Sequence, residues 1–236
     1  MSKDNSIWDE VLLPAQMPKD EYDRFIHHVN RCNERLIESA RKFDSDVRDQ
    51  VCLSVDFKRL GLKPQKEYDD IPFRMEECGD GKSTVASSGC AILIAKFLER
   101  FFRKEKCFSV EELTKATVSY GYRGYRKNPD GSYTPMGCKH VFFDRFVPAL
   151  YEISVERADS WEKVMKSIWD NKITVLLVKN SVYKSEPENQ DSHFVVLIGY
   201  DYKRVILFDP EYNHLIKKSY DEIIPGLKAG WIFSEI

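Results

Sequence analysis

The chain has 236 residues, enough for one domain of ordinary to large size or for a domain with a substantial extension. A hydrophobic fraction of 42% and an aromatic fraction of 13% support a packed core and exclude the disordered class. The net charge of −2 gives no electrostatic reason to expect nucleic acid or anionic lipid as a partner.

Targeting signals are absent from the sequence pattern. The first residues, MSKDNSIWDEVLLPAQ, carry no apolar segment behind a basic start, and no apolar run elsewhere reaches membrane-spanning length. We therefore expect a soluble, non-exported, cytoplasmic protein with no membrane partner. Its six cysteines show no paired spacing, which favours free thiols over a disulfide framework.

The N-terminal part of the chain predicts a helical extension. Residues 19–43 repeat apolar side chains at helical spacing, which is typical of an amphipathic helix packed on a larger body. Residues 60–72 are polar and contain proline, as a connecting loop would. We place a helical extension at 1–65 and the main domain at 66–236. The extension could cap a cleft, mediate self-association or recruit a partner.

The main domain is predicted to begin with helices and to continue with strands. The helix that starts near Gly89 is apolar on several sides, which indicates a central element of the core. Further helices are predicted at 110–121, at 138–152, where Pro148 should end or bend the helix, and after Ser160 as an N-cap. Strands are then predicted at 173–180, 193–200, 204–210 and 231–236. This order favours an α+β fold with a mainly antiparallel sheet.

Cys90 and His193 are candidate catalytic residues because of where they stand in these elements. The stretch VASSGC places Cys90 at the start of the apolar helix, where backbone N–H groups and the helix dipole favour a thiolate. A cysteine nucleophile needs a base within hydrogen-bond reach. Of the five histidines, His193 opens the almost continuously apolar strand SHFVVLIGY, where a polar group usually has a specific role.

Asp209 is the candidate that would orient the imidazole, and strand register decides whether it can reach. A three-residue loop, 201–203, would pair Tyr200 with Arg204 and place Asp209 opposite Val195. His193 and Asp209 would then share one face as diagonal neighbours. A four-residue loop would place them on opposite faces, and a bulge would be needed to bring them together.

The stretches VASSGCAILIAKFL, ITVLLVKN and SHFVVLIGYDYKRVILFDP together resemble the papain-like cysteine peptidases of the bacteriocin-leader (double-glycine) processing family. The resemblance covers roughly residues 71–236. It implies a papain-like fold in which Cys90 is the nucleophile, His193 the general base and acid, and Asp209 the residue that orients His193. It implies a peptide or protein substrate and no cofactor or metal.

The sequence departs from this family at the oxyanion hole. The family usually has a glutamine upstream of the cysteine, whereas Met75 and Glu76 stand where that amide is expected, and neither side chain can donate a hydrogen bond in the same way. Ser87, Ser88 and Lys82 are candidate replacements, and Ala91 replaces a more usual glycine. The gap leaves open an inactive, peptide-binding relative. The same thiol chemistry also allows acyl transfer or deamidation.

Other constellations have plainer explanations. His28, Cys32, Cys138 and His140 could supply four zinc ligands, but no spacing joins the two halves, and buried cysteines commonly act as small apolar residues. The run SYGYRGYRKN interleaves tyrosine and arginine as some nucleic-acid-binding proteins do. Without a basic surplus elsewhere, we interpret it as a β-ribbon or loop edge near the cleft. Residues 184–191 are expected to form a polar loop beside that cleft.

Overall fold

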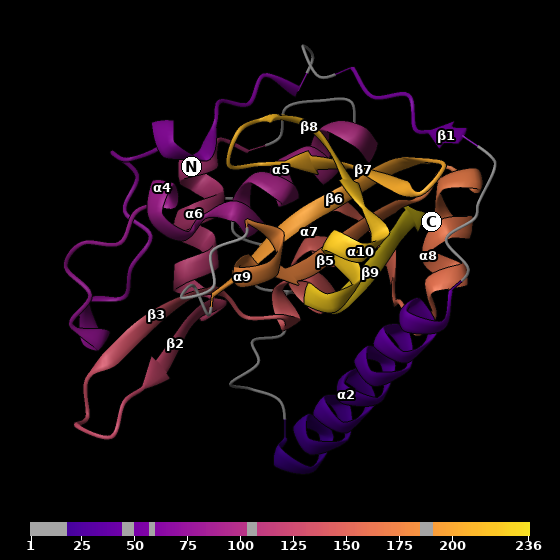
Figure 1. The fold of residues 1–236 in the computed structure, drawn as a ribbon. Coiled ribbons are helices and arrows are strands. Elements are labelled where there is room, and N and C mark those ends of the chain that lie inside the picture. The colour runs from indigo at the N-terminus through magenta and orange to yellow at the C-terminus, as the bar shows by residue number, and fades with distance from the viewer. Residues whose placement is uncertain (1–17, 44–49, 57–59, 103–107, 185–190) are drawn as a thin grey trace.

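A seven-stranded sheet forms the centre of the computed structural model, which describes residues 18–43, 50–56, 60–102, 108–184 and 191–236 (Figure 1). Six strands follow the order β4 (Ile153–Arg157), β9 (Leu227–Glu235), β5 (Ile173–Lys179), β6 (Ser192–Asp201), β7 (Arg204–Asp209) and β8 (His214–Ser219), and the seventh, β1 (Gln50–Cys52), pairs with β6 off this path. All of these neighbours pair antiparallel. The predicted α+β class with a mainly antiparallel sheet is confirmed.

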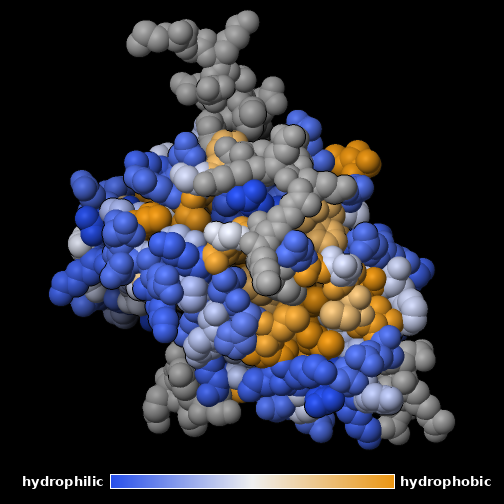
Figure 2. Space-filling view, turned by 90° about the horizontal axis from the view of Figure 1, so that it is seen from above, coloured by the Kyte–Doolittle hydropathy of each residue, from blue (hydrophilic) through white to orange (hydrophobic). Residues whose placement is uncertain are grey.

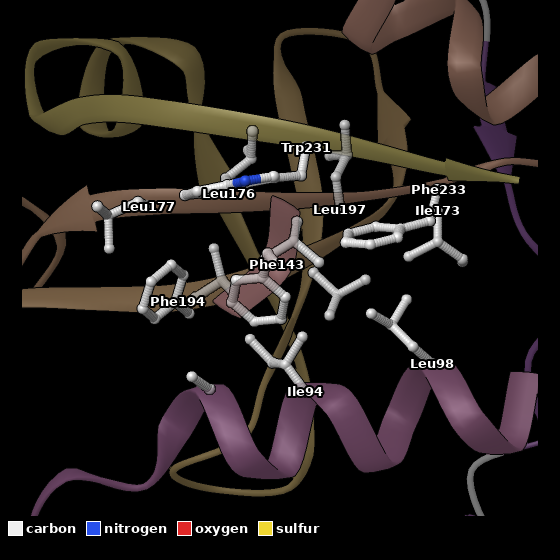
Figure 3. Close-up of a cluster of buried hydrophobic side chains, with 14 of the residues drawn as sticks. Ile94, Leu98, Phe143, Ile173, Leu176, Leu177, Phe194, Leu197, Trp231 and Phe233 are labelled. Carbon is white, nitrogen blue, oxygen red and sulfur yellow. The ribbon is translucent and has the colours of Figure 1, made fainter. Parts of the chain in front are cut away.

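Helices cover both faces of this sheet. The longer ones are α2 (Lys19–Lys42), α5 (Cys90–Phe102), α6 (Val110–Ser119) and α8 (Trp161–Trp169). Because strand side chains alternate between the two faces of a sheet, adjacent residues of β9 point toward the two different layers of helices. A Cβ built on Gly230 would meet Leu36 of α2, whereas the next residue, Trp231, packs against Phe143 with ring centroids 5.5 Å apart. Ile94 and Leu98 of α5 lie on the Phe143 side (Figure 3).

Short elements fill the connections. They are η2 (Gln65–Glu67), η3 (Glu76–Cys78), α4 (Val85–Ser88), α7 (Val147–Tyr151), α9 (Asn180–Tyr183), α10 (Tyr220–Ile223), η5 (Ile224–Gly226) and a π-helical turn at Phe142–Phe146. The strands β2 (Arg123–Lys127) and β3 (Tyr133–Cys138) pair as a hairpin that projects from the body (Figure 1). The predicted ribbon for the tyrosine–arginine run is therefore present as β2 and its partner.

The helix α5 is the central element that its composition predicts. Every residue from Cys90 to Glu99 is buried. Even its charged pair is enclosed, with Lys96 Nζ 2.6 Å from Glu99 Oε1. A helix buried on all sides can hold its first turn rigidly, which matters because that turn carries Cys90.

The expectation that Pro148 ends the helix is wrong. The strand β3 extends to Cys138, and Pro148 lies within a helical segment in which a π-helical turn, Phe142–Phe146, leads directly into α7. Proline cannot donate the usual intrahelical hydrogen bond, and a π-helical turn is the kind of irregularity at which helices bend. The helix instead ends at Glu152, whose φ of 52° is left-handed.

The residues before 66 contribute to the same core as those after it. Leu36 of α2 is fully buried, and the strand β1 (Gln50–Cys52) pairs with the far end of β6. Gly199 makes this pairing feasible, because a Cβ there would lie 2.3 Å from the carbonyl oxygen of Val51. The division of the chain at residue 65 stays a prediction.

The face seen from above is hydrophilic over much of its area, and its largest hydrophobic area lies below the centre of the view (Figure 2). Among the described residues, no helix combines the length and the apolar character needed to cross a membrane.

Candidate active site

Cys90 is positioned by a tight junction between two helices. The short helix α4 is held by Ser87, whose hydroxyl accepts from Thr84 N–H at 3.1 Å. Gly89 then connects α4 to α5, and a Cβ at this glycine would lie 2.5 Å from Val85 Cγ1. Only a residue without a side chain fits, so the small-residue run before the cysteine serves to bring α4 close to the start of α5.

The environment of Cys90 favours its thiolate. Burial opposes the charge, but the hydrogen bond and the positive charge of His193 outweigh it, and the net effect lowers the pKa of the thiol. The backbone N–H groups of Phe194 and Ala91 add to the same effect. The two groups therefore stabilise each other in the ionic form, thiolate and imidazolium.

His193 connects Cys90 to Asp209. Its Nε2 lies 2.8 Å from Asp209 Oδ1, which leaves Nδ1 for the thiol. Burial by itself would lower the pKa of His193, but the hydrogen bonds to Asp209 and Cys90 and their charges raise it to about 9. The imidazolium form therefore persists to mildly alkaline pH.

Asp209 is fully buried and accepts three hydrogen bonds. Besides His193, the Tyr183 hydroxyl donates to Oδ2 at 2.8 Å and the backbone N–H of Glu211 donates to Oδ1 at 2.8 Å. Burial opposes the negative charge, yet these donors and the charge of His193 hold the pKa of Asp209 below its usual value. Tyr183 was not singled out by the sequence, because nothing in the segment before residue 184 signals a partner 26 residues away.

The strand register that joins His193 and Asp209 differs from the predicted one at its start. Asp201 pairs with Arg204, so the turn has two residues and is shorter than both the three-residue and the four-residue loop considered from the sequence. A bulge at Ile198 then shifts the register, and Val196 lies opposite Phe208. One residue further along this register Asp209 falls opposite Val195, as predicted, and His193 and Asp209 share a face.

Cys90 and His193 line a cleft of about 520 Å³, and so does Gln65, which the sequence did not single out. Gln65 is buried, its backbone N–H donates to Pro210 O at 3.1 Å, and its Nε2 donates to Ala86 O at 3.1 Å. Its Oε1 has no hydrogen-bond partner. Gln65 thus connects the loop after Asp209 with the helix before Cys90. In the sequence, Gln65 lies in the predicted connection between the extension and the main domain, and an uncharged amide side chain is the only feature that could have marked it as a cleft residue.

The predicted oxyanion positions divide into two groups. Met75 and Glu76 stand where the family glutamine was expected. Among the described residues that line the cleft, neither of them is present, and Lys82 is not present either. Ser87 and Ser88 do line it. The cleft therefore does contain a side-chain amide, that of Gln65. It stands 25 positions before Cys90, further upstream than Met75 and Glu76, where the sequence suggested it.

The four side chains weighed as zinc ligands lie in two separate places. His28 and Cys32 contact each other on α2, with Nε2 and Sγ 3.6 Å apart, while Cys138 and His140 line the cleft. Within the described ranges, the group with metal-like spacing is His193, Asp209 and Glu211, two of which are the hydrogen-bonded pair described above. His140 is neutral at physiological pH, because burial, Arg157 and Lys228 lower its pKa to about 4.

The predicted polar loop is described only at its ends. Lys184 and Asp191 line the cleft, and residues 185–190 lie outside the described residues. The cysteines that the structure does describe, at 32, 52, 78, 90 and 138, are all unbridged thiols.

Comparison with solved structures places the fold. The chain resembles the crystal structure of a candidate C39-like peptidase from Bacillus anthracis, with a TM-score of 0.53 and 15% sequence identity. The match covers 80% of this chain and 98% of that one. No protein-family model matches the sequence, and no curated protein matches it at a significant level. The chain has the C39-like peptidase fold, and at this identity the likeness extends to the fold alone.

Proposed function

We propose that this protein is a cysteine hydrolase that cleaves a peptide or related amide bond. The observation that carries the proposal is the placement of Cys90 and His193 in the wall of one cleft, with His193 held by Asp209 at 2.8 Å and acting to lower the pKa of the Cys90 thiol. The C39-like peptidase fold supports the same class of chemistry. The substrate is a peptide or a protein, and the triad needs neither a metal nor an organic cofactor.

In this mechanism the Cys90 thiolate attacks the carbonyl carbon of the scissile bond and forms a tetrahedral oxyanion. The His193 imidazolium protonates the leaving amine, the C–N bond breaks, and an acyl-thioester remains on Cys90. Neutral His193 then takes a proton from water, which hydrolyses the thioester. Asp209 holds the ring through Nε2 in both steps, and Tyr183 holds Asp209.

Gln65 is the side-chain amide we assign to the oxyanion. An amide nitrogen has two N–H groups, and only one is used on Ala86 O. Together with the backbone N–H of Cys90, the second N–H would stabilise the developing charge, an effect commonly of the order of 10²–10³ in rate. This assignment removes the main sequence argument for an inactive relative.

The test is to incubate the protein with a proteome-derived peptide mixture and to identify new termini by mass spectrometry. Wild-type protein should generate cleavage products, whereas Cys90→Ala and Cys90→Ser should not, with unchanged unfolding midpoints. Peptides recovered uncut by wild type after long incubation would overturn the proposal and favour a binding protein. Products that gain an amine instead of water would identify acyl transfer.

A further inference from the structure

A lysine stands beside the catalytic histidine in the cleft. Lys228, the second residue of β9, donates from Nζ to Ser192 Oγ at 2.6 Å, and Ser192 immediately precedes His193. Strand pairing places it there, because Val178 of β5 pairs with both Leu227 and His193. Lys228, Ser192 and His193 all line the cleft that contains Cys90.

The charge of Lys228 is incompletely compensated. The other cleft lysine, Lys184, forms an ion pair with Glu211, whereas Lys228 forms none with any carboxylate in the described ranges. Partial burial lowers the pKa of Lys228, Lys179 lowers it further, and Asp191 alone acts in the opposite direction. An ammonium group that has lost part of its hydration gains from an incoming anion.

The chemistry of the triad indicates which part of a substrate meets this lysine. His193 delivers its proton to the leaving amine, so the segment on the C-terminal side of the scissile bond lies toward His193. Ser192 and Lys228 continue the wall from His193. We propose that Lys228 binds a carboxylate on the leaving side of the substrate, and that the enzyme therefore prefers acidic sequences after the scissile bond. This inference rests on the proposed function.

The first experiment needs no substrate. Cys90 is alkylated with anionic iodoacetate and with neutral iodoacetamide, and the ratio of the two rates is measured by mass spectrometry. The ratio cancels changes in thiol ionisation and reports the local potential. In Lys228→Glu it should fall roughly threefold or more at low salt, because a charge in the wall of the same cleft still exerts a Coulomb energy above thermal energy on an anion approaching Cys90.

Lys166→Glu makes the same charge change on the exposed surface of α8 and should leave the ratio unchanged. A ratio that is equal in wild type and Lys228→Glu would show that the charge at position 228 does not act on an anion approaching Cys90, and would overturn the inference. Cys90 that reacts with neither reagent would contradict the proposed function itself, so the two failures are distinguishable.

The second experiment compares cleavage profiles in the peptide mixture. Wild type should enrich Asp and Glu within the first positions after the cut, and Lys228→Glu should lose that preference and favour Lys and Arg. Peptides with free or amidated C-termini distinguish a side-chain carboxylate from a terminal one. Cleavage by wild type with no acidic preference, or the same preference in Lys228→Glu, would overturn the inference while leaving the hydrolase intact.

Discussion

His193 and Asp209 meet because one residue, Ile198, is bulged out of the strand between them and the turn. The Nε2–Oδ1 distance of 2.8 Å follows from the shifted register, in which Val196 lies opposite Phe208. If the pairing of Asp201 with Arg204 continued without the bulge, His193 and Asp209 would point to opposite faces of the sheet. A local irregularity therefore brings His193 and Asp209 together, and bulges often re-aim side chains in this way.

Alkylation of Cys90 against pH should reveal a thiolate–imidazolium pair. The thiol pKa is lowered and the His193 pKa is raised to about 9, so both charges coexist between these two values. The rate with iodoacetamide should rise well below the ordinary thiol pKa of about 8.5 and change again near pH 9, where His193 loses its proton.

The matching variant is His193→Ala. It removes the partner that lowers the thiol pKa and leaves the burial that raises it, so the rise in alkylation rate should move to higher pH. Cys32 and Cys52, whose thiol pKa values are raised mainly by burial, are internal references in the same digest. A profile identical in both proteins would contradict the assignment of His193.

Tyr183→Phe should destabilise the protein and weaken the support of Asp209. The change removes the donor to Oδ2 inside a buried site, and a lost hydrogen bond to a charged group costs about 1.5–3 kcal/mol. Urea unfolding measures this difference. Tyr220→Phe is the matched control, since its hydroxyl donates only to the weak acceptor Met165 Sδ at 3.4 Å and should cost less.

Gln65→Ala should lower kcat by roughly 10²–10³ without changing the rate at which Cys90 is alkylated, because the amide acts on the oxyanion and not on the thiolate. Ser88→Ala, which removes a cleft hydroxyl, should have a much smaller effect. If Gln65→Ala slowed alkylation as strongly as turnover, the role of the glutamine would be to hold the site together through its hydrogen bonds to Ala86 O and Pro210 O, and not to donate to the oxyanion.

Gly199→Ala should weaken the attachment of β1. A Cβ would lie 2.3 Å from Val51 O, which is backbone and cannot rotate away, so we expect a loss of about 2 kcal/mol or more in the free energy of unfolding. Gly81→Ala is the control, because nothing lies within 4 Å of the added carbon. Equal unfolding midpoints for the two variants would show that β1 contributes little to stability.

The sequence by itself determined the elements that depend on local periodicity. Spacing and composition predict three elements: the helix α2, the buried helix α5 with Cys90 at its start, and the apolar strand β6, which has His193 near its beginning. Burial on one side or on all sides of an element leaves a pattern of apolar residues that is visible in the sequence. Even the shared face of His193 and Asp209 was anticipated, although through a loop length that the structure does not have.

Only the tertiary structure decided how distant segments complete the site. The bulge at Ile198, the hydroxyl of Tyr183 on Asp209 and the amide of Gln65 between Ala86 and Pro210 depend on contacts between segments far apart in the chain. No periodic pattern encodes such contacts, because a bulge or a docked loop is selected by the packing of both partners together. Local sequence therefore specified the nucleophile and its strand, and packing specified the groups that hold them.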